Sequence, residues 1–171
     1  LVEELKQRGV RIVDSPDEVN DGETLVIRSH GVEQSVTERA KELGVKTEDA
    51  TCPFVAKIHS IAAEKGREGC VTLIAGDASH QEVKGIVGHC TGEAFVFSDE
   101  NELTKLLAEN ENFAEKRVIL VSQTTFNEKI FIKCRNILKK VCTNAKIFDT
   151  ICNATSMRQQ EARELSEKND V

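Results

Sequence analysis

Short apolar runs and helical apolar stripes follow one another along this chain. Three runs are almost entirely apolar or β-branched, as in strands buried on both faces of a parallel sheet: residues 24–27, 70–75 and 117–121. The stripes repeat apolar residues three or four positions apart, which is typical of helices with one buried face. One stripe consists of Phe54, Ile58, Ile61 and Ala62. The alternation of the two patterns indicates an α/β protein.

The pattern predicts where most elements lie. Helices are expected over about residues 1–8, 33–43, 53–65, 81–88, 99–109, 127–142 and 161–168. Strands or short extended pieces are expected over about residues 10–13, 24–27, 45–47, 70–75, 94–97, 117–121 and 146–148. Strand and helix alternate strictly from residue 70 to residue 148, which predicts right-handed crossovers. The expected fold class is α/β, with a parallel sheet and flanking helices.

Composition and charge narrow the class of protein. The 171 residues are 39% hydrophobic, and the formal net charge of −6 argues against a general nucleic-acid surface. Apolar runs stay well short of the roughly 20 residues that span a bilayer, and we find no secretory signal. We therefore expect a cytoplasmic protein with neither nucleic acid nor membrane as a partner. Leu1 is not a start methionine, and residues 169–171 resemble a turn entering a strand, so we expect a piece of a longer protein.

Two short stretches of the chain echo each other. Asp49-Ala50-Thr51-Cys52-Pro53 and Asp149-Thr150-Ile151-Cys152-Asn153 each place an acidic residue after a strand and a cysteine at the entrance of a helix. A helix N-terminus favours thiolate over thiol, and thiolate is the form that binds iron. We expect these two thiolates to hold an inorganic cofactor beside an anionic substrate. The alternative for any cysteine is a small buried hydrophobe.

The remaining cysteines have plainer surroundings. Cys70, Cys134 and Cys142 are interpreted as buried filler, and Cys90 fits either interpretation. C-x-x-C pairs do not occur, which argues against a zinc ribbon or a thioredoxin-type motif.

Polar motifs gather after strands, where the carboxyl ends of a parallel sheet meet at one edge. The turns concerned carry His30, Cys52, His80 with Glu82, Thr124, and Cys152. We expect them to share one rim, with the two histidines forming an anion pocket. Glu82 has two interpretations, a proton donor or the third position of a capping box that begins at Ser79.

Three further assignments come from helix patterns. A second capping box over residues 125–128 would occupy Thr125 and leave Thr124 to face a ligand. His59 is interpreted as structural, and His89 as a partner of a helix dipole. Neither G-x-G-x-x-G nor a Walker A sequence is present, so a dinucleotide or P-loop site is not supported.

Five ordered motifs closely resemble those of the LytB/IspH family, whose members are 4-hydroxy-3-methylbut-2-enyl diphosphate reductases. The motifs are Arg28-Ser29-His30-Gly31-Val32, Asp49-Ala50-Thr51-Cys52-Pro53, Gly76-Asp77-Ala78-Ser79-His80-Gln81-Glu82, Ser122-Gln123-Thr124-Thr125 and Asp149-Thr150-Ile151-Cys152-Asn153-Ala154-Thr155. The resemblance implies three similar α/β domains around a [4Fe-4S] cluster held by three cysteines, with the fourth iron open to the substrate hydroxyl. Cys52 and Cys152 would be the second and third ligands.

The resemblance also implies roles for the other rim residues. His30 and His80 would bind the diphosphate, Glu82 would deliver a proton, and Thr124 would orient the substrate hydroxyl and Glu82. The reaction would remove that hydroxyl reductively to give isopentenyl and dimethylallyl diphosphate. Its electrons would come from an external donor of the ferredoxin or flavodoxin type.

The chain departs from the family pattern at its ends. The first cysteine motif, an early His-Asn motif and the downstream Ser/Asn phosphate loops are absent. We therefore expect residues 1–50 to be the rear part of a first domain, residues 51–148 a complete second domain, and residues 149–171 the opening loop and helix of a third. Alone, the chain is expected to bind no intact cluster and to turn over no substrate.

Two other hypotheses stay open. One is a non-catalytic diphosphate-binding or assembly module with the same fold. The other is a redox dithiol protein, which would need Cys52 and Cys152 within disulfide range.

Overall fold

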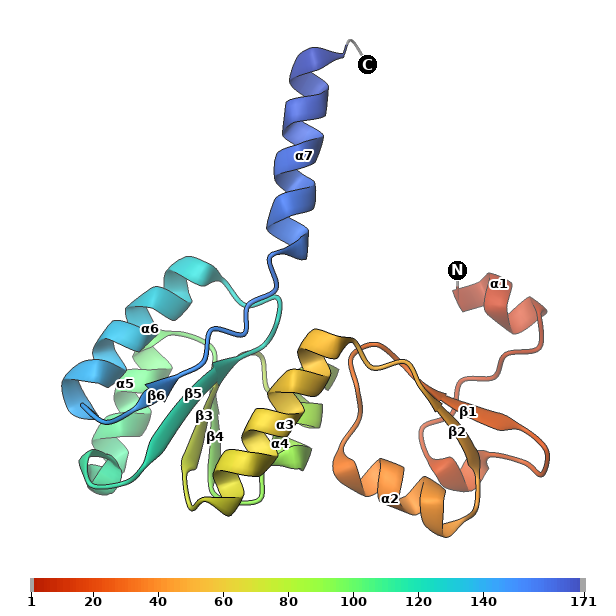
Figure 1. Ribbon diagram of the computed structural model, residues 1–171, viewed down its shortest axis with the longest axis horizontal. Coiled ribbons are helices and arrows are strands. Elements are labelled where there is room, and N and C mark those ends of the chain that lie inside the picture. Colours follow the sequence, from red (N-terminus) through yellow and green to blue (C-terminus); the bar gives the residue numbers. More distant parts are fainter. Residues whose placement is uncertain (1, 170–171) are drawn as a thin grey trace.

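The computed structural model describes residues 2–169, which form two parallel β-sheets with helices packed on them (Figure 1). The smaller sheet pairs β1 (Thr24–Ile27) with β2 (Lys46–Asp49). The larger sheet has the order β4-β3-β5-β6, with β3 (Val71–Ala75), β4 (Ala94–Phe97), β5 (Val118–Ser122) and β6 (Lys146–Ile147). All of these strand pairs are parallel. The predicted α/β class with parallel strands is confirmed.

Helices connect the strands in the predicted order. They are α1 (Val2–Gln7), α2 (Gln34–Glu42), α3 (Pro53–Arg67), α4 (Gln81–His89), α5 (Glu100–Glu109), α6 (Glu128–Val141) and α7 (Ala154–Lys168). Two 3-10 turns, η1 (Pro16–Glu18) and η2 (Glu111–Ala114), lie between the longer elements. Helices α3 and α4 cover one face of the larger sheet and α5 and α6 cover the other, while α7 projects away from it (Figure 1). In the part of the chain that the structure describes, no helix is long and apolar enough to cross a membrane.

Each face of the larger sheet has its own hydrophobic core, because successive strand residues point to opposite faces. Leu73 packs with residues of α5 and α6, whereas its neighbour Ile74 packs with residues of α3 and α4. Both side chains are 0% exposed. Strands buried on both sides read as continuous apolar runs, which explains why β3 and β5 were predictable.

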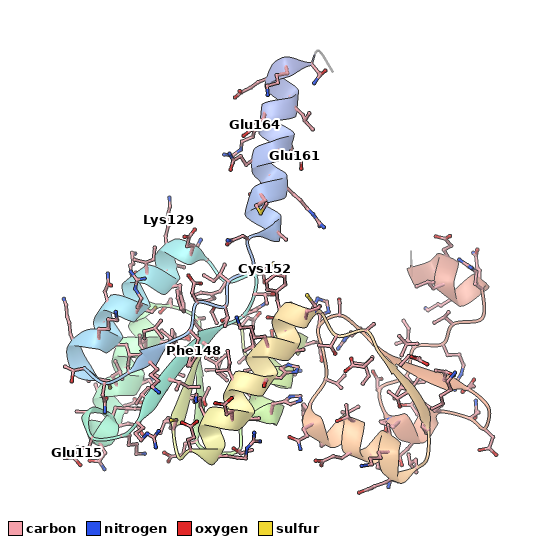
Figure 2. The ribbon with its side chains drawn as sticks, viewed as in Figure 1. Glu115, Lys129, Phe148, Cys152, Glu161 and Glu164 are labelled. Carbon is pink, nitrogen blue, oxygen red and sulfur yellow. The ribbon has the colours of Figure 1, made fainter. Side chains whose placement is uncertain are left out.

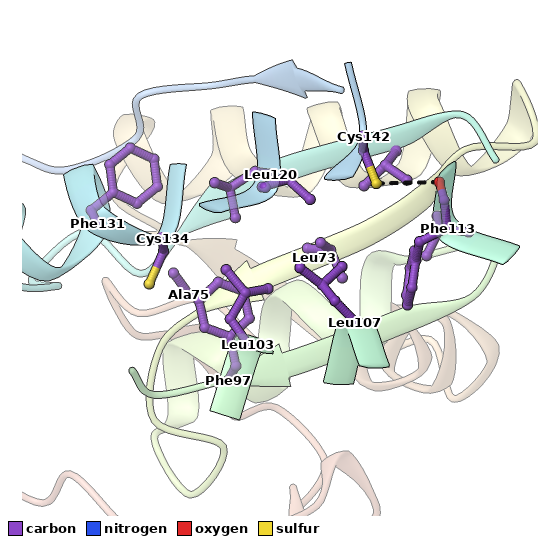
Figure 3. Packing of buried hydrophobic residues seen from close by; sticks show 13 residues of the cluster. Leu73, Ala75, Phe97, Leu103, Leu107, Phe113, Leu120, Phe131, Cys134 and Cys142 are labelled. Carbon is purple, nitrogen blue, oxygen red and sulfur yellow. Dashed lines mark hydrogen bonds between the residues drawn. The ribbon is translucent and has the colours of Figure 1, made fainter. Parts of the chain in front are cut away.

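Three cysteines belong to these cores, as predicted. Cys70, Cys134 and Cys142 are buried, and Figure 3 shows the latter two among the side chains of the α5/α6 core. The Cys142 thiol donates to the main-chain oxygen of Phe113 at 3.2 Å, and burial raises the pKa of this thiol. These side chains fill space in the cores.

One local prediction is wrong and a second fails at one residue. Residues 10–13 form no strand, and within residues 2–169 they pair with none; Val10 and Ile12 are 49% and 66% exposed. In α3 the predicted stripe holds for Ile58 and Ala62, which are buried, but not for Phe54, which is 59% exposed while its neighbour Val55 is buried. The division of the chain into three domains stays a prediction.

Candidate functional site

The carboxyl ends of β3 and β5 lie side by side at one edge of the larger sheet. Ala75, the last residue of β3, is paired with Ser122, the last residue of β5. The Gln123 main-chain N–H donates to the Ala75 oxygen at 2.8 Å, so the two following loops leave the sheet together. These loops carry His80 with Glu82 and Thr124, and this edge is where ligands bind in open α/β sheets.

Glu82 and Thr124 form a buried pair at this edge. The Thr124 main-chain N–H donates to Glu82 Oε1 at 2.6 Å, and the Thr124 hydroxyl donates to Glu82 Oε2 at 2.8 Å. Glu82 is 2% exposed and Thr124 is 8% exposed. A carboxylate that accepts two hydrogen bonds from one residue has a fixed position and orientation. The contact joins residues 42 positions apart in sequence.

The predicted capping box at Ser79 is wrong. His80 is the N-cap of α4, where its Nδ1 accepts from the Glu82 main-chain N–H at 3.1 Å. Ser79 instead donates its main-chain N–H and hydroxyl to Asp77 Oδ1, and the hydroxyl bond is the main reason that the pKa of Asp77 is lowered. The Glu82 side chain binds Thr124 and does not reach back to the cap. His80 lies outside the regular helix, so it and Glu82 are not held on opposite helix faces.

The second predicted capping box is also wrong. Asn127 caps α6, and its side-chain oxygen accepts from the Ile130 main-chain N–H at 3.1 Å. Thr125 accepts a hydrogen bond from Gln123 Nε2 at 3.1 Å. Gln123 Oε1 also accepts from the Asp77 main-chain N–H at 3.2 Å, so this buried amide bridges the two loops. No role was predicted for Gln123, although it lies inside the motif Ser122-Gln123-Thr124-Thr125.

His30 reaches this edge from the smaller sheet. It follows β1, and its ring lies 5.5 Å from the ring of His80, edge to face at 86°. The turn continues through Gly31, which has a φ of +70°, a left-handed conformation that glycine adopts without strain. The two histidines predicted to form an anion pocket are therefore neighbours, although they come from different sheets.

Main-chain hydrogen bonds attach both cysteine turns to this cluster. Cys52 is the N-cap of α3, and its N–H donates to the main-chain oxygen of Ser29, the residue before His30, at 2.9 Å. The Cys152 N–H donates to the main-chain oxygen of Thr124 at 2.7 Å. Figure 2 shows Cys152 in the linker between the larger sheet and α7. The six predicted site residues therefore form one connected series that runs from Cys52 to Cys152. Each link in the series is a contact made by a site residue or by its neighbour in sequence.

A further contact, which was not predicted from the sequence, holds the Cys152 turn. Thr150 Oγ1 accepts from the Ser122 main-chain N–H and donates to the Ser122 main-chain oxygen, both at 2.8 Å. The side chain thereby continues the pairing of β5 beyond β6. Thr150 lies two residues before Cys152, but the matching position before Cys52 is Ala50, so the similarity of the two motifs gave no signal for this contact.

The donor set suits iron in type but is incomplete. Cys52 and Cys152 are unpaired thiols with partly exposed side chains, and Cys152 Sγ accepts from the Ala154 main-chain N–H at 3.5 Å. Cysteine thiolates are the usual ligands of iron–sulfur clusters. Among residues 2–169, no group of three or more His, Cys, Asp or Glu side chains is arranged to hold a metal ion. The described residues thus include two thiols of the type that binds such clusters, without a group of three or more possible ligands.

Comparison with known proteins matches the entire chain to one family. The family model described as LytB protein covers residues 1–171. A 4-hydroxy-3-methylbut-2-enyl diphosphate reductase of Helicobacter pylori (strain Shi470) is 36% identical over 166 residues, which are 97% of this chain and 58% of the relative. A reductase of the same name from Caldanaerobacter subterraneus subsp. tengcongensis is 38% identical over 173 residues. The chain spans 58% of the length of both relatives.

Solved structures give the same result. A structure of (E)-4-hydroxy-3-methyl-but-2-enyl diphosphate reductase, the terminal enzyme of the non-mevalonate pathway, matches 99% of this chain with a TM-score of 0.82 and 33% identity. The match covers 59% of that structure's chain. The corresponding reductase of Plasmodium falciparum matches 97% of this chain with a TM-score of 0.82 and 28% identity.

Proposed function

This chain belongs to the LytB family, and from that premise we propose that it supplies part of the active site of a reductase acting on 4-hydroxy-3-methylbut-2-enyl diphosphate. The reaction would remove the allylic hydroxyl with two electrons and two protons, giving isopentenyl and dimethylallyl diphosphate. One observation supports this assignment most directly: Thr124 holds the buried carboxyl group of Glu82, whose main-chain N–H donates to His80, and the His80 ring adjoins that of His30. This arrangement suits protonation next to a bound anion.

The histidines are suited to binding the diphosphate. Because His80 Nδ1 accepts a hydrogen bond from the Glu82 main chain, the proton of the neutral His80 ring belongs on Nε2, which can donate to a phosphate oxygen. His30 approaches the same ring from another sheet. Two donors on separate elements can bind separate oxygens of one diphosphate.

Glu82 is suited to delivering a proton. Both of its oxygens are bound by Thr124, so a proton on this carboxyl group would have a fixed direction. The Thr124 hydroxyl, which already donates to Glu82, can accept from a substrate hydroxyl at the same time. Thr124 would then orient both the carboxyl group and the substrate.

Cys52 and Cys152 would bind the cofactor. Both stand at the entrance of a helix, and thiolate is the form of cysteine that binds iron. When bound, a [4Fe-4S] cluster would supply electrons and a Lewis-acidic iron for the substrate hydroxyl. We propose that the electrons come from a protein of the ferredoxin or flavodoxin type, and a cytoplasmic location remains our prediction. The 171-residue chain alone is expected to assemble no complete cluster, since the described residues contain no group of three or more possible ligands.

A chimaera tests this function. In it, the chain replaces the matching 58% of the Helicobacter pylori relative, and the product is purified without oxygen. We expect the chimaera to contain iron and sulfide and to reduce the diphosphate substrate. Glu82→Gln should retain the cluster signal in electron paramagnetic resonance but lose about 10²- to 10⁴-fold in turnover, as for a lost general acid.

Cysteine variants of the same chimaera separate the alternatives. Cys52→Ala and Cys152→Ala should each lose the cluster. Cys90→Ala is the matched control, because Cys90 is also partly exposed but follows the opposite end of α4. Normal turnover with an intact cluster in Cys52→Ala would refute the ligand assignment. Binding of the diphosphate by an iron-free chimaera that turns nothing over would favour the non-catalytic module, and a disulfide between Cys52 and Cys152 would favour the dithiol protein.

A further inference from the structure

His59 occupies the place where three segments of the site converge. Its ring comes from α3 and is 7% exposed. A Cβ atom added to Gly31 would lie 2.5 Å from His59 Cε1, and one added to Gly85 in α4 would lie 3.1 Å from His59 Nε2. The ring therefore lies between two glycines, one in the turn that follows His30 and one in the helix that His80 caps.

His89 closes the same cluster from the far end of α4. The rings of His59 and His89 are stacked, with centroids 4.0 Å apart and an interplanar angle of 13°. His89 Nδ1 is also 2.8 Å from the main-chain oxygen of Gly85. The ring of His59 is thus bounded by Gly31, Gly85 and His89, and it has little room to move.

A histidine at this position needs an explanation other than apolar packing. His59 Nε2 is buried and has no hydrogen-bond partner within the described structure. A buried polar atom without a partner is unfavourable, and an apolar side chain would avoid it. Burial, followed by the neighbouring His89, lowers the pKa of His59 to about 4, so the ring is neutral near pH 7. A flat, uncharged ring is thin enough to fit between two glycine main chains.

We infer that His59 is a positioning residue, whose ring fixes the Gly31 turn against α4 and so holds His30 beside His80. His59 acts through His30 and need not contact the substrate itself. One expected consequence rests on the proposed function: diphosphate binding should weaken when the rings of His30 and His80 separate. The geometric part, which is the distance between the His30 and His80 rings, can be measured without any ligand.

Nuclear magnetic resonance of the histidine-labelled chain tests the geometry. Rings whose centroids are 5.5 Å apart and edge to face should give a cross-relaxation signal between His30 and His80. His59→Ala should abolish that signal, whereas His59→Gln, whose flat amide reaches the same depth, should retain it. Ala62→Gly is the control, since Ala62 is also buried on α3 but belongs to the core of the larger sheet.

Binding of inorganic pyrophosphate tests the consequence. His59→Ala should raise the dissociation constant about tenfold, the size expected for one weakened charge-assisted hydrogen bond, and His59→Gln should restore most of the loss. If His59→Ala does not fold, Gly85→Ala provides the test, because its added Cβ would push on His59 Nε2 and should weaken the His30–His80 signal. An unchanged His30–His80 signal in a folded variant would overturn the inference. Failure of the unaltered chain to bind pyrophosphate would instead count against the proposed function and leave the ring geometry to decide this inference.

Discussion

Acidification should destabilise this protein through one buried side chain, His59. Burial is the main cause that lowers its pKa from the ordinary 6.5 to about 4; the stacked His89 lowers it further, and Asp49 opposes the shift. Between these two values the unfolded chain binds a proton that the folded chain excludes. Protonation of His59 therefore leaves the free energy of unfolding unchanged above about pH 6.5 and lowers it as the pH falls toward 4.

Linkage gives the size of the effect. The two pKa values correspond to a loss of about 2 kcal/mol of unfolding free energy between about pH 7.5 and pH 5, and of about 3 kcal/mol by pH 4. Small domains are stable by roughly 5–15 kcal/mol, so this loss is large enough to measure. It should appear as a steeper pH dependence than in a variant whose residue 59 does not ionise.

Urea unfolding followed by circular dichroism at several pH values measures the difference. His59→Gln removes the titrating group, and Ser60→Ala, an exposed substitution in the same helix, is the control. The other acidic and basic groups are common to all three proteins, so the differences between the curves isolate His59. Parallel curves for the unaltered chain and His59→Gln from about pH 7.5 to pH 5 would refute the reasoning, whereas Ser60→Ala should follow the unaltered chain.

Three further outcomes are expected from particular contacts. Thr124→Val leaves Glu82 Oε2 without its hydroxyl partner and should lower the free energy of unfolding, measured in urea, by about 1–3 kcal/mol. Thr143→Val, at an exposed loop position, is the control and should change it little. Gly66→Ala would bring a Cβ to 2.9 Å from the main-chain nitrogen of Thr91. We therefore expect the free energy of unfolding to fall by about 1–3 kcal/mol, although alanine has the better helix propensity. A variant of equal or greater stability would contradict this packing. A thiol reagent followed by mass spectrometry should modify Cys52 and Cys152 before Cys134, because Cys134 is buried and burial raises its pKa to about 11; comparable rates would show that the core is open.

The sheet was predictable wherever burial alone decides the structure. Strands β3 and β5 are covered on both faces, so their sequences are continuous apolar runs and reveal a strand without knowledge of its neighbours. Residues 10–13 carry a similar local signal, but a strand also requires hydrogen-bonded pairing, and in the described chain these residues pair with no strand. Local pattern is therefore sufficient only where the surrounding sheet agrees with it.

The site was predictable in its location but not in its contacts. Strand ends and helix starts identified the turns, since the carboxyl ends of parallel strands share an edge. The bond between Glu82 and Thr124 spans 42 positions, and no spacing rule reaches that far; only the family resemblance implied that Thr124 orients Glu82. Both predicted capping boxes are wrong. Ser79 bonds Asp77 and Thr125 bonds Gln123, so His80 caps α4 and Asn127 caps α6 in their place. His59 was assigned a structural place, but only the fold brings Gly31 and Gly85 to its ring.

The way in which the cysteine turns are attached decides how cysteine variants should be interpreted. Each turn is held by its own main chain, through the bonds from Cys52 to Ser29 and from Cys152 to Thr124. A change to alanine removes the sulfur but retains both main-chain N–H donors, so the turns should remain next to His30 and Thr124. Loss of iron in Cys52→Ala would therefore report on the missing thiolate and not on a displaced turn. If the same variant also lost pyrophosphate binding, the sulfur itself, or the metal that it holds, would have to contribute to the position of the histidines.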